Sequence, residues 1–181
     1  MKALIVIDMQ HDFVDGTLGS ADAKTIVNKV AAKVKEYVNS NEENIILYTR
    51  DTHFPDYLDT NEGKHLPVEH CIMGTWGWEI VPEVFNDSNS AVVDKYDFGL
   101  HNLPAVLQEL ACRCYENWEI DSIELVGLCT DICVVSNALI LKSVFSDVPI
   151  YVDAACCAGT CPAAHEAALK VMTSCQIEVL N

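Results

Sequence analysis

Three side chains that could together carry out acyl transfer lie far apart in this chain. Asp8 and Lys95 each end a short apolar run, and Cys133 lies in "GLCTDICVV", just after a third such run. A thiol becomes a nucleophile when a base takes its proton and a nearby cation stabilises the negative charge. No histidine is an obvious base by position, whereas a buried carboxylate has the raised pKa that this role needs. These residues predict acyl-transfer chemistry without a histidine.

The sequence around Cys133 suits a nucleophile at the start of a helix. If a helix begins near Asp131, Cys133 lies in its first turn, where free backbone N–H groups and the helix dipole favour a thiolate. The backbone amides of such a strand-to-helix turn can also donate to an oxyanion. Thr130 or Asp131 is expected to cap the helix, and Cys129 is expected to be buried before the turn.

Each of the three candidates also has an ordinary explanation. Asp8 could cap a loop, Lys95 could be a surface lysine, and Cys133 could be a core thiol, as we expect for most of the other cysteines. The chemical interpretation is favoured because all three fall at the ends of apolar runs.

Those apolar runs have the character of buried strands, and they occupy residues 3–8, 44–49, 91–95, 122–127, 148–153 and 175–180. Amphipathic patterns typical of helices lie between most of them, at residues 25–38, 103–116, 131–145 and 162–174. This alternation predicts an α/β fold with a parallel sheet, in one domain of residues 1–181. Because the carboxyl ends of parallel strands meet at one edge, the three candidates are predicted to converge there.

A second group of chemical residues lies in the irregular stretch 50–90, which is long enough to be functional. Asp51 and His53 stand two residues apart in "RDTH", so both can face one side of an extended segment, and His70 follows in "PVEHC". One carboxylate and two imidazoles suit a divalent transition metal, although scattered loop histidines are the alternative. Three further residues of the stretch could supply another ligand, namely Asp59, Glu62 and His65.

The composition excludes several classes of function. The net charge of −16 leaves nothing to neutralise the phosphates of a nucleic acid, and it disfavours an anionic membrane surface. We expect no targeting segment and no membrane span. Nine cysteines without a CxxC pair predict neither a disulfide framework nor a structural zinc knuckle, and they indicate a cytoplasmic protein. "VIDMQHDFVDG" lacks the glycines of a dinucleotide-binding turn.

Five motifs in this order resemble the isochorismatase-like cysteine hydrolase superfamily: "ALIVIDMQHDFVDGTL", "TRDTH", "HCIMGTWGWEI", "VDKYDF" and "GLCTDICVVSNAL". The resemblance extends to "AGTCPAAHEAAL" and covers nearly the whole chain. It implies a three-layer α/β/α fold with a doubly wound, mainly parallel sheet of about six strands. It also implies that Cys133 is the nucleophile, Asp8 the proton carrier and Lys95 the third member of a triad. The matching cis peptide bond is Leu128–Cys129, and the oxyanion hole is formed by the backbone amides of Cys129 and Cys133.

Within that superfamily the chain resembles the nicotinamidases, because Asp51, His53 and His70 match their metal-binding pattern. This resemblance implies a bound zinc, manganese or iron ion that holds the ring nitrogen of nicotinamide, directly or through its waters. It implies hydrolysis of this small amide to nicotinate and ammonia, and a homo-oligomer. Phe13 matches the aromatic wall of the ring pocket, which Trp76 and Trp78 could extend if they do not pack in the core. The fourth ligand matches Glu62 in one variant of the pattern and Asp59 in another.

Two stretches depart from the nicotinamidase pattern. The helix after Cys133 reads "SNALIL" instead of continuing with T-A-x-D-A, and "KYDFGLHN" lacks the usual Ser-Ala-Phe after Lys95. These departures leave open a hydrolase that acts on another carboxamide, an N-carbamoyl compound or a vinyl ether. A protein of a different class, a non-catalytic thiol sensor or scaffold on the same fold, is the remaining alternative.

Overall fold

The computed structural model describes residues 1–116 and 118–181, and in these residues the central sheet has six strands. They are β1 (Lys2–Ile7), β2 (Asn44–Asp51), β3 (Ser90–Lys95), β4 (Ser122–Leu128), β5 (Ile150–Ala158) and β6 (Glu178–Leu180). All neighbouring pairs are parallel, in the order β3-β2-β1-β4-β5-β6. The chain winds outward from β1 in both directions, so the doubly wound parallel sheet predicted from the sequence is confirmed.

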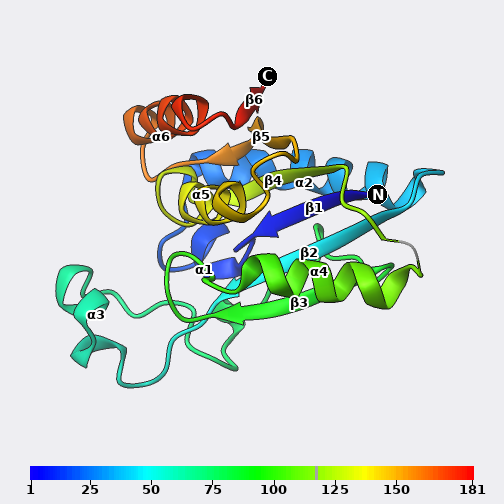
Figure 1. Ribbon diagram of the computed structural model, residues 1–181. Helices are drawn as coiled ribbons and strands as arrows, with labels where there is room; N and C mark the ends of the chain where they lie inside the picture. The colour runs from blue at the N-terminus through cyan, green and yellow to red at the C-terminus, as the bar shows by residue number, and fades with distance from the viewer. Residues whose placement is uncertain (117) are drawn as a thin grey trace.

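Helices cover both faces of this sheet (Figure 1). They are α1 (His11–Val14), α2 (Ala21–Asn39), α3 (Asn61–His65), α4 (Leu103–Cys114), α5 (Val135–Val144) and α6 (Pro162–Ser174). Helix α2 packs on one face, whereas α4, α5 and α6 pack on the other. Strand β1 shows the reason: Leu4 and Val6 face α2, and Ile5 and Ile7 point the opposite way into the larger core. The three-layer arrangement is therefore confirmed.

The predicted elements all exist, with shifted ends. Helix α2 begins four residues earlier than expected, at Ala21, because the Ser20 hydroxyl accepts a hydrogen bond from the Ala23 amide at 3.0 Å and caps it. Strand β5 extends to Ala158, which pairs with Leu128 of β4. The register between the two strands shifts between Leu125 and Gly127. None of the helices in the described residues has the length and apolar character that crossing a bilayer requires.

The stretch between β2 and β3 contains little regular structure, as predicted. It holds α3 and two short 3₁₀ turns, η1 (Tyr57–Asp59) and η2 (Trp76–Trp78). A parallel bridge between His53 and Ile72 joins the start of this stretch to its middle, and an antiparallel bridge joins Ile80 to Gln10. In Figure 1, α3 lies beyond the carboxyl ends of the neighbouring strands, so this stretch stands over the edge where a site was expected.

Candidate active site

The ammonium group of Lys95 lies in contact with three of the candidate side chains at the carboxyl ends of the strands. Its side chain is fully buried, and Nζ lies 2.8 Å from Asp8 Oδ2, 2.8 Å from Asp51 Oδ1 and 3.4 Å from Cys133 Sγ. Lys95 is the last residue of β3 and pairs in register with Asp51, the last residue of β2. The structure therefore brings together Asp8, Lys95 and Cys133, which sequence analysis placed at three separate strand ends.

Asp8 follows β1 directly and is completely buried. The Thr49 hydroxyl donates a hydrogen bond to Asp8 Oδ1 at 2.6 Å and accepts one from the Asp8 amide at 3.2 Å. Burial raises the pKa of Asp8 above its ordinary value, although the charge of Lys95 opposes this effect. Asp8 thus has the position and the basicity of a proton acceptor next to the thiol.

Cys133 lies in the π-helical turn η3 (Thr130–Val134), which leads into α5. Burial raises the pKa of its thiol well above the ordinary value, and the charge of Asp8 raises it further. The helix N-terminus was expected to favour a thiolate, but such an effect is worth about 0.3–1 kcal/mol at an exposed site. Burial and the neighbouring carboxylate outweigh it here, so the resting thiol keeps its proton and needs a base.

The capping prediction for η3 is wrong. The N-cap is Cys129, and its carbonyl accepts hydrogen bonds from the amides of Ile132 and Val134, both at 3.1 Å. The side chains of Thr130 and Asp131 instead bond to other elements: Thr130 Oγ1 lies 2.8 Å from His165 Nδ1 on α6, and Asp131 accepts from the Thr160 amide at 2.8 Å. These contacts fix η3 to the neighbouring segments. The Leu128–Cys129 peptide bond is cis, as the resemblance implied.

Four side chains beside Lys95 form a group that could hold a metal ion: Asp51, His53, Glu62 and His70. One ligand atom from each lies within 4.8 Å of all the others. Glu62 completes the set, and neither Asp59 nor His65 belongs to this group in the described residues. The three ligands predicted from the sequence are therefore adjacent, and the open choice of a fourth falls on Glu62.

The chemistry of these donors fits a divalent transition metal. His70 Nδ1 lies 2.8 Å from the Val68 carbonyl oxygen, which can only accept, so Nδ1 carries the proton and Nε2 is free to ligate. His53 Nε2 lies 3.0 Å from Asp51 Oδ2. Although burial opposes ionisation, the hydrogen bond from His53 and the charge of Lys95 lower the pKa of Asp51 to about 2. A permanent carboxylate and two imidazoles are the ligand types that such ions bind.

Gln10 holds the end of β2 in place beneath this group. Its side chain is completely buried, donates to the Asp51 carbonyl at 2.9 Å and accepts from the Asp51 amide at 2.7 Å. Sequence analysis did not single out Gln10, because an uncharged amide inside "VIDMQHDF" carries no chemical signal. Its position two residues after Asp8 is the only feature that could have suggested a role.

A cavity of about 1040 Å³ joins the metal-ligand group to Cys133. Phe13 lines it as predicted, with its ring centroid 5.5 Å from that of His70. Tyr96 and Phe98 also line it. Sequence analysis missed these two aromatic residues, although they directly follow Lys95 at a strand end.

Trp76 and Trp78 do not belong to the lining of this cavity. Trp76 stacks on His11 with centroids 4.2 Å apart, and Trp78 donates from Nε1 to Thr52 Oγ1 at 2.8 Å. The Arg50 guanidinium lies 3.6 Å from the centre of the Trp78 ring. Neither alternative left open for these tryptophans is met, since they do not extend the aromatic wall and do not belong to the buried core, and Trp76 is 55% exposed.

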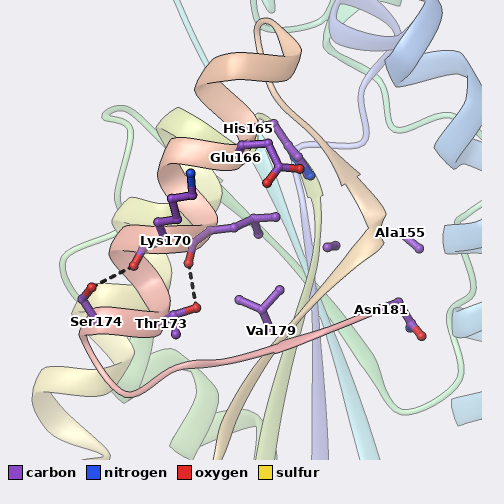
Figure 2. A pocket seen from close by; sticks show the side chains of 10 residues that line it. Ala155, His165, Glu166, Lys170, Thr173, Ser174, Val179 and Asn181 are labelled. Atoms are coloured by element: carbon purple, nitrogen blue, oxygen red, sulfur yellow. Dashed lines mark hydrogen bonds between the residues drawn. The ribbon is translucent and has the colours of Figure 1, made fainter.

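A second hollow of about 620 Å³ lies along α6 and the end of the sheet (Figure 2). Its lining includes His165, Glu166 and Lys170 of α6 together with Val179 and Asn181 near the C-terminus. It contains none of the predicted catalytic or metal-binding residues. The residues predicted to be catalytic or metal-binding that line a cavity therefore line the larger one, at the carboxyl ends of the strands.

Comparison with known proteins agrees with this arrangement. The model of the isochorismatase domain matches residues 2–181. The nicotinamidase of Saccharomyces cerevisiae is 23% identical, in a match that covers 77% of this chain and 80% of that protein. The structure of a pyrazinamidase/nicotinamidase from Streptococcus mutans superposes with a TM-score of 0.81 at 27% identity, covering 99% of this chain and 100% of the other. A pyrazinamidase from Pyrococcus horikoshii, solved in complex with zinc, gives a TM-score of 0.82 at 24% identity, covering 99% and 98%.

The central position of Lys95 gives a prediction about stability. Replacing it by methionine, in Lys95→Met, leaves the buried carboxylates of Asp8 and Asp51 without their cation. We expect the free energy of unfolding, measured with urea in the presence of a chelator, to fall by about 3–5 kcal/mol. Adding Asp8→Asn to this variant should restore part of the loss, because only one of the two carboxylates then remains charged and unpaired.

Lys2→Met is the matched control, because Lys2 makes its ion pair with Glu42 on the surface, where such pairs contribute little. Equal effects of Lys95→Met and Lys2→Met would show that the buried ion pairs do not stabilise the fold.

Proposed function

Because the chain belongs to the isochorismatase family, we propose that it hydrolyses nicotinamide to nicotinate and ammonia through a thioester on Cys133. The family and its nicotinamidase relatives show that the chain is a hydrolase acting on amides. The proposal of nicotinamide as substrate and Cys133 as nucleophile rests on the contact of the Lys95 ammonium group with Asp8, Asp51 and Cys133. This contact joins a nucleophile and its base to a group of metal ligands.

In the first half of the reaction, Asp8 takes the proton of the Cys133 thiol. The thiolate attacks the amide carbon, and negative charge develops on the carbonyl oxygen. The backbone amides of Cys129 and Cys133 would donate to this oxyanion, and each such donor lowers the barrier by about 2.7–4 kcal/mol. Lys95 stabilises the thiolate from 3.4 Å. The carbon–nitrogen bond then breaks, and the protonated Asp8 gives its proton to the departing nitrogen, which leaves as ammonia.

The second half of the reaction releases the acid. Asp8, again a carboxylate, takes a proton from a water molecule that attacks the thioester carbonyl. The carbon–sulfur bond breaks, Asp8 returns its proton to the sulfur of Cys133, and the acid leaves as nicotinate after its remaining proton passes to the solvent. Burial supports this double role, because it raises the pKa of Asp8 and so makes this carboxylate a stronger proton acceptor than an ordinary aspartate.

The group formed by Asp51, His53, Glu62 and His70 would hold a divalent metal ion, and zinc, manganese and iron are the candidates. Such an ion supplies a positive centre that holds the pyridine nitrogen of the substrate, directly or through a water molecule. The pyrazinamidase of the same fold that was solved with zinc supports this proposal. Phe13 lies beside His70 in the cavity lining and would pack on the ring.

The nucleophile is tested by Cys133→Ala. We expect this variant to lose ammonia release from nicotinamide by at least about 10⁴-fold while it keeps its fold and its metal content. Cys161→Ala, an exposed cysteine outside the cavity, is the control and should retain activity. Retained turnover in Cys133→Ala would end the proposal, and rapid alkylation of Cys133 without hydrolysis of any amide would favour a thiol sensor.

The metal ligands are tested by elemental analysis of purified variants. We expect His53→Ala and Glu62→Ala to lower the amount of bound metal per chain, because each removes one ligand atom from the group. Asp59→Ala should keep the metal content of the original protein, since Asp59 stands in the same stretch but outside the group. Unchanged metal in His53→Ala would rule out this site.

The role of Asp8 predicts a pH dependence. Asp8 must be ionised to accept the thiol proton, and burial raises its pKa above the ordinary value of an aspartate. As the pH falls through this raised pKa, Asp8 gains a proton and kcat/KM decreases. The acid limb of the profile should therefore lie above the pH at which a free aspartate titrates, and Asp8→Asn should be inactive throughout.

Asp15→Asn, which removes an exposed carboxylate outside the cavity, should leave the pH profile unchanged. An acid limb in the range of an ordinary aspartate would contradict the assignment of Asp8 as the base.

A further inference from the structure

The cavity is larger than nicotinamide requires. Its volume of about 1040 Å³ reaches the upper end of the range of roughly 300–1,000 Å³ for sites that enclose drug-sized ligands. Nicotinamide is a single six-membered ring with one amide group. Part of the lining belongs to residues that have no role in the proposed reaction. Some of them are polar, such as Thr60, Asn61 and Thr160, but most of the surface that faces the cavity is apolar. The apolar and aromatic members are Leu18, Leu66, Tyr96, Phe98 and Ile132, so the additional space suits an apolar group.

Aromatic rings are exposed at the mouth of this space. Tyr96 is 57% exposed and Phe98 47% exposed, although both line the cavity. Phe54, also 46% exposed, stacks on Tyr96 with ring centroids 5.8 Å apart and an angle of 18° between the planes. Grouped apolar side chains at the surface commonly mark a binding site. The loop 96–99 thus presents an aromatic surface next to the nucleophile.

The backbone of this loop is fixed to the catalytic residues. Lys95 donates from Nζ to the Asp97 carbonyl at 3.3 Å. The completely buried side chain of Asn137 donates to the carbonyls of Phe98 at 3.2 Å and Cys133 at 2.8 Å, and it accepts from the Leu100 amide at 2.9 Å. The aromatic rings are therefore carried by a backbone whose position relative to the Cys133 sulfur is set by hydrogen bonds. A preorganised surface of this kind reduces the cost of ordering on binding.

We propose that the aromatic loop 96–99 gives this chain a preference for bicyclic aromatic carboxamides over nicotinamide. The second ring would lie against Tyr96 and Phe98, while the amide carbon stays at Cys133. The reaction is unchanged: the carbon–nitrogen bond of the amide breaks, water supplies the new oxygen, and ammonia leaves. This inference rests on the proposed amide hydrolysis and specifies its substrate class.

The test compares nicotinamide with quinoline-3-carboxamide, which is nicotinamide carrying a fused benzene ring. With the metal-loaded protein we expect kcat/KM for ammonia release to be higher for the bicyclic amide by about tenfold or more, the order expected for additional apolar contact in a pocket. Tyr96→Ala and Phe98→Ala should each lower this ratio. Phe85→Ala is the matched control, because Phe85 is 45% exposed and packs on Tyr48 outside the cavity, so the ratio should not change.

A second measurement does not depend on turnover. Cys133→Ala should bind quinoline-3-carboxamide more tightly than nicotinamide in calorimetry, and adding Phe98→Ala should reduce this difference. Efficient hydrolysis of nicotinamide combined with no preference for the bicyclic amide would overturn the inference and leave the proposed function intact. A preference that Tyr96→Ala and Phe98→Ala do not alter would also overturn it. Hydrolysis of neither amide would overturn the proposed function, and the inference with it.

Discussion

The buried ammonium group of Lys95 is the constraint on which this edge of the sheet depends. Removing a charge from water costs several kcal/mol unless partners compensate for it. The partners here are Asp8 and Asp51, each 2.8 Å away. The three residues end or follow adjacent parallel strands, so their contact requires the register in which Asp51 pairs with Lys95. A shift of one residue would turn one of these side chains to the other face of the sheet.

The same ammonium group links two chemical functions. Asp51 directs Oδ1 to Lys95 and Oδ2 to His53, so one carboxylate belongs both to the buried ion pairs and to the metal-ligand group. Cys133 Sγ lies 3.4 Å from the same ammonium group, and burial raises the pKa of its thiol well above the ordinary value. In the proposed reaction such a thiol depends on Asp8 for activation. The site therefore forms one electrostatic unit, in which the charge of each member affects the protonation of the others.

The two stretches that depart from the nicotinamidase pattern meet in space. Asn137 belongs to "SNALIL", and it holds the backbone of Phe98 and Leu100 in "KYDFGLHN". Gly99 of the second stretch packs so closely on the first that a Cβ there would lie 2.7 Å from Cδ1 of Ile140. Residues 96–99 line the cavity that also contains Cys133, and the first stretch supports them without lining it. The two departures from the nicotinamidase pattern, separate along the chain, are thus in contact in the folded protein.

The sequence by itself determined the sheet, its parallel strands and the residues at their ends, because buried strands need continuous apolar runs and a polar residue that ends such a run stands out. It also indicated Asp51, His53 and His70, since their types and spacing are those of metal ligands.

Only the tertiary structure decided that Glu62 is the fourth member of the metal-ligand group and that Gln10 and Asn137 hold the backbone around the cavity. It also decided that Tyr96 and Phe98 line the cavity while Trp76 and Trp78 do not. It also moved Thr130 and Asp131 from capping to contacts with other segments. The physical reason is that these roles depend on which distant segments pack against a side chain, and local sequence carries no record of that packing.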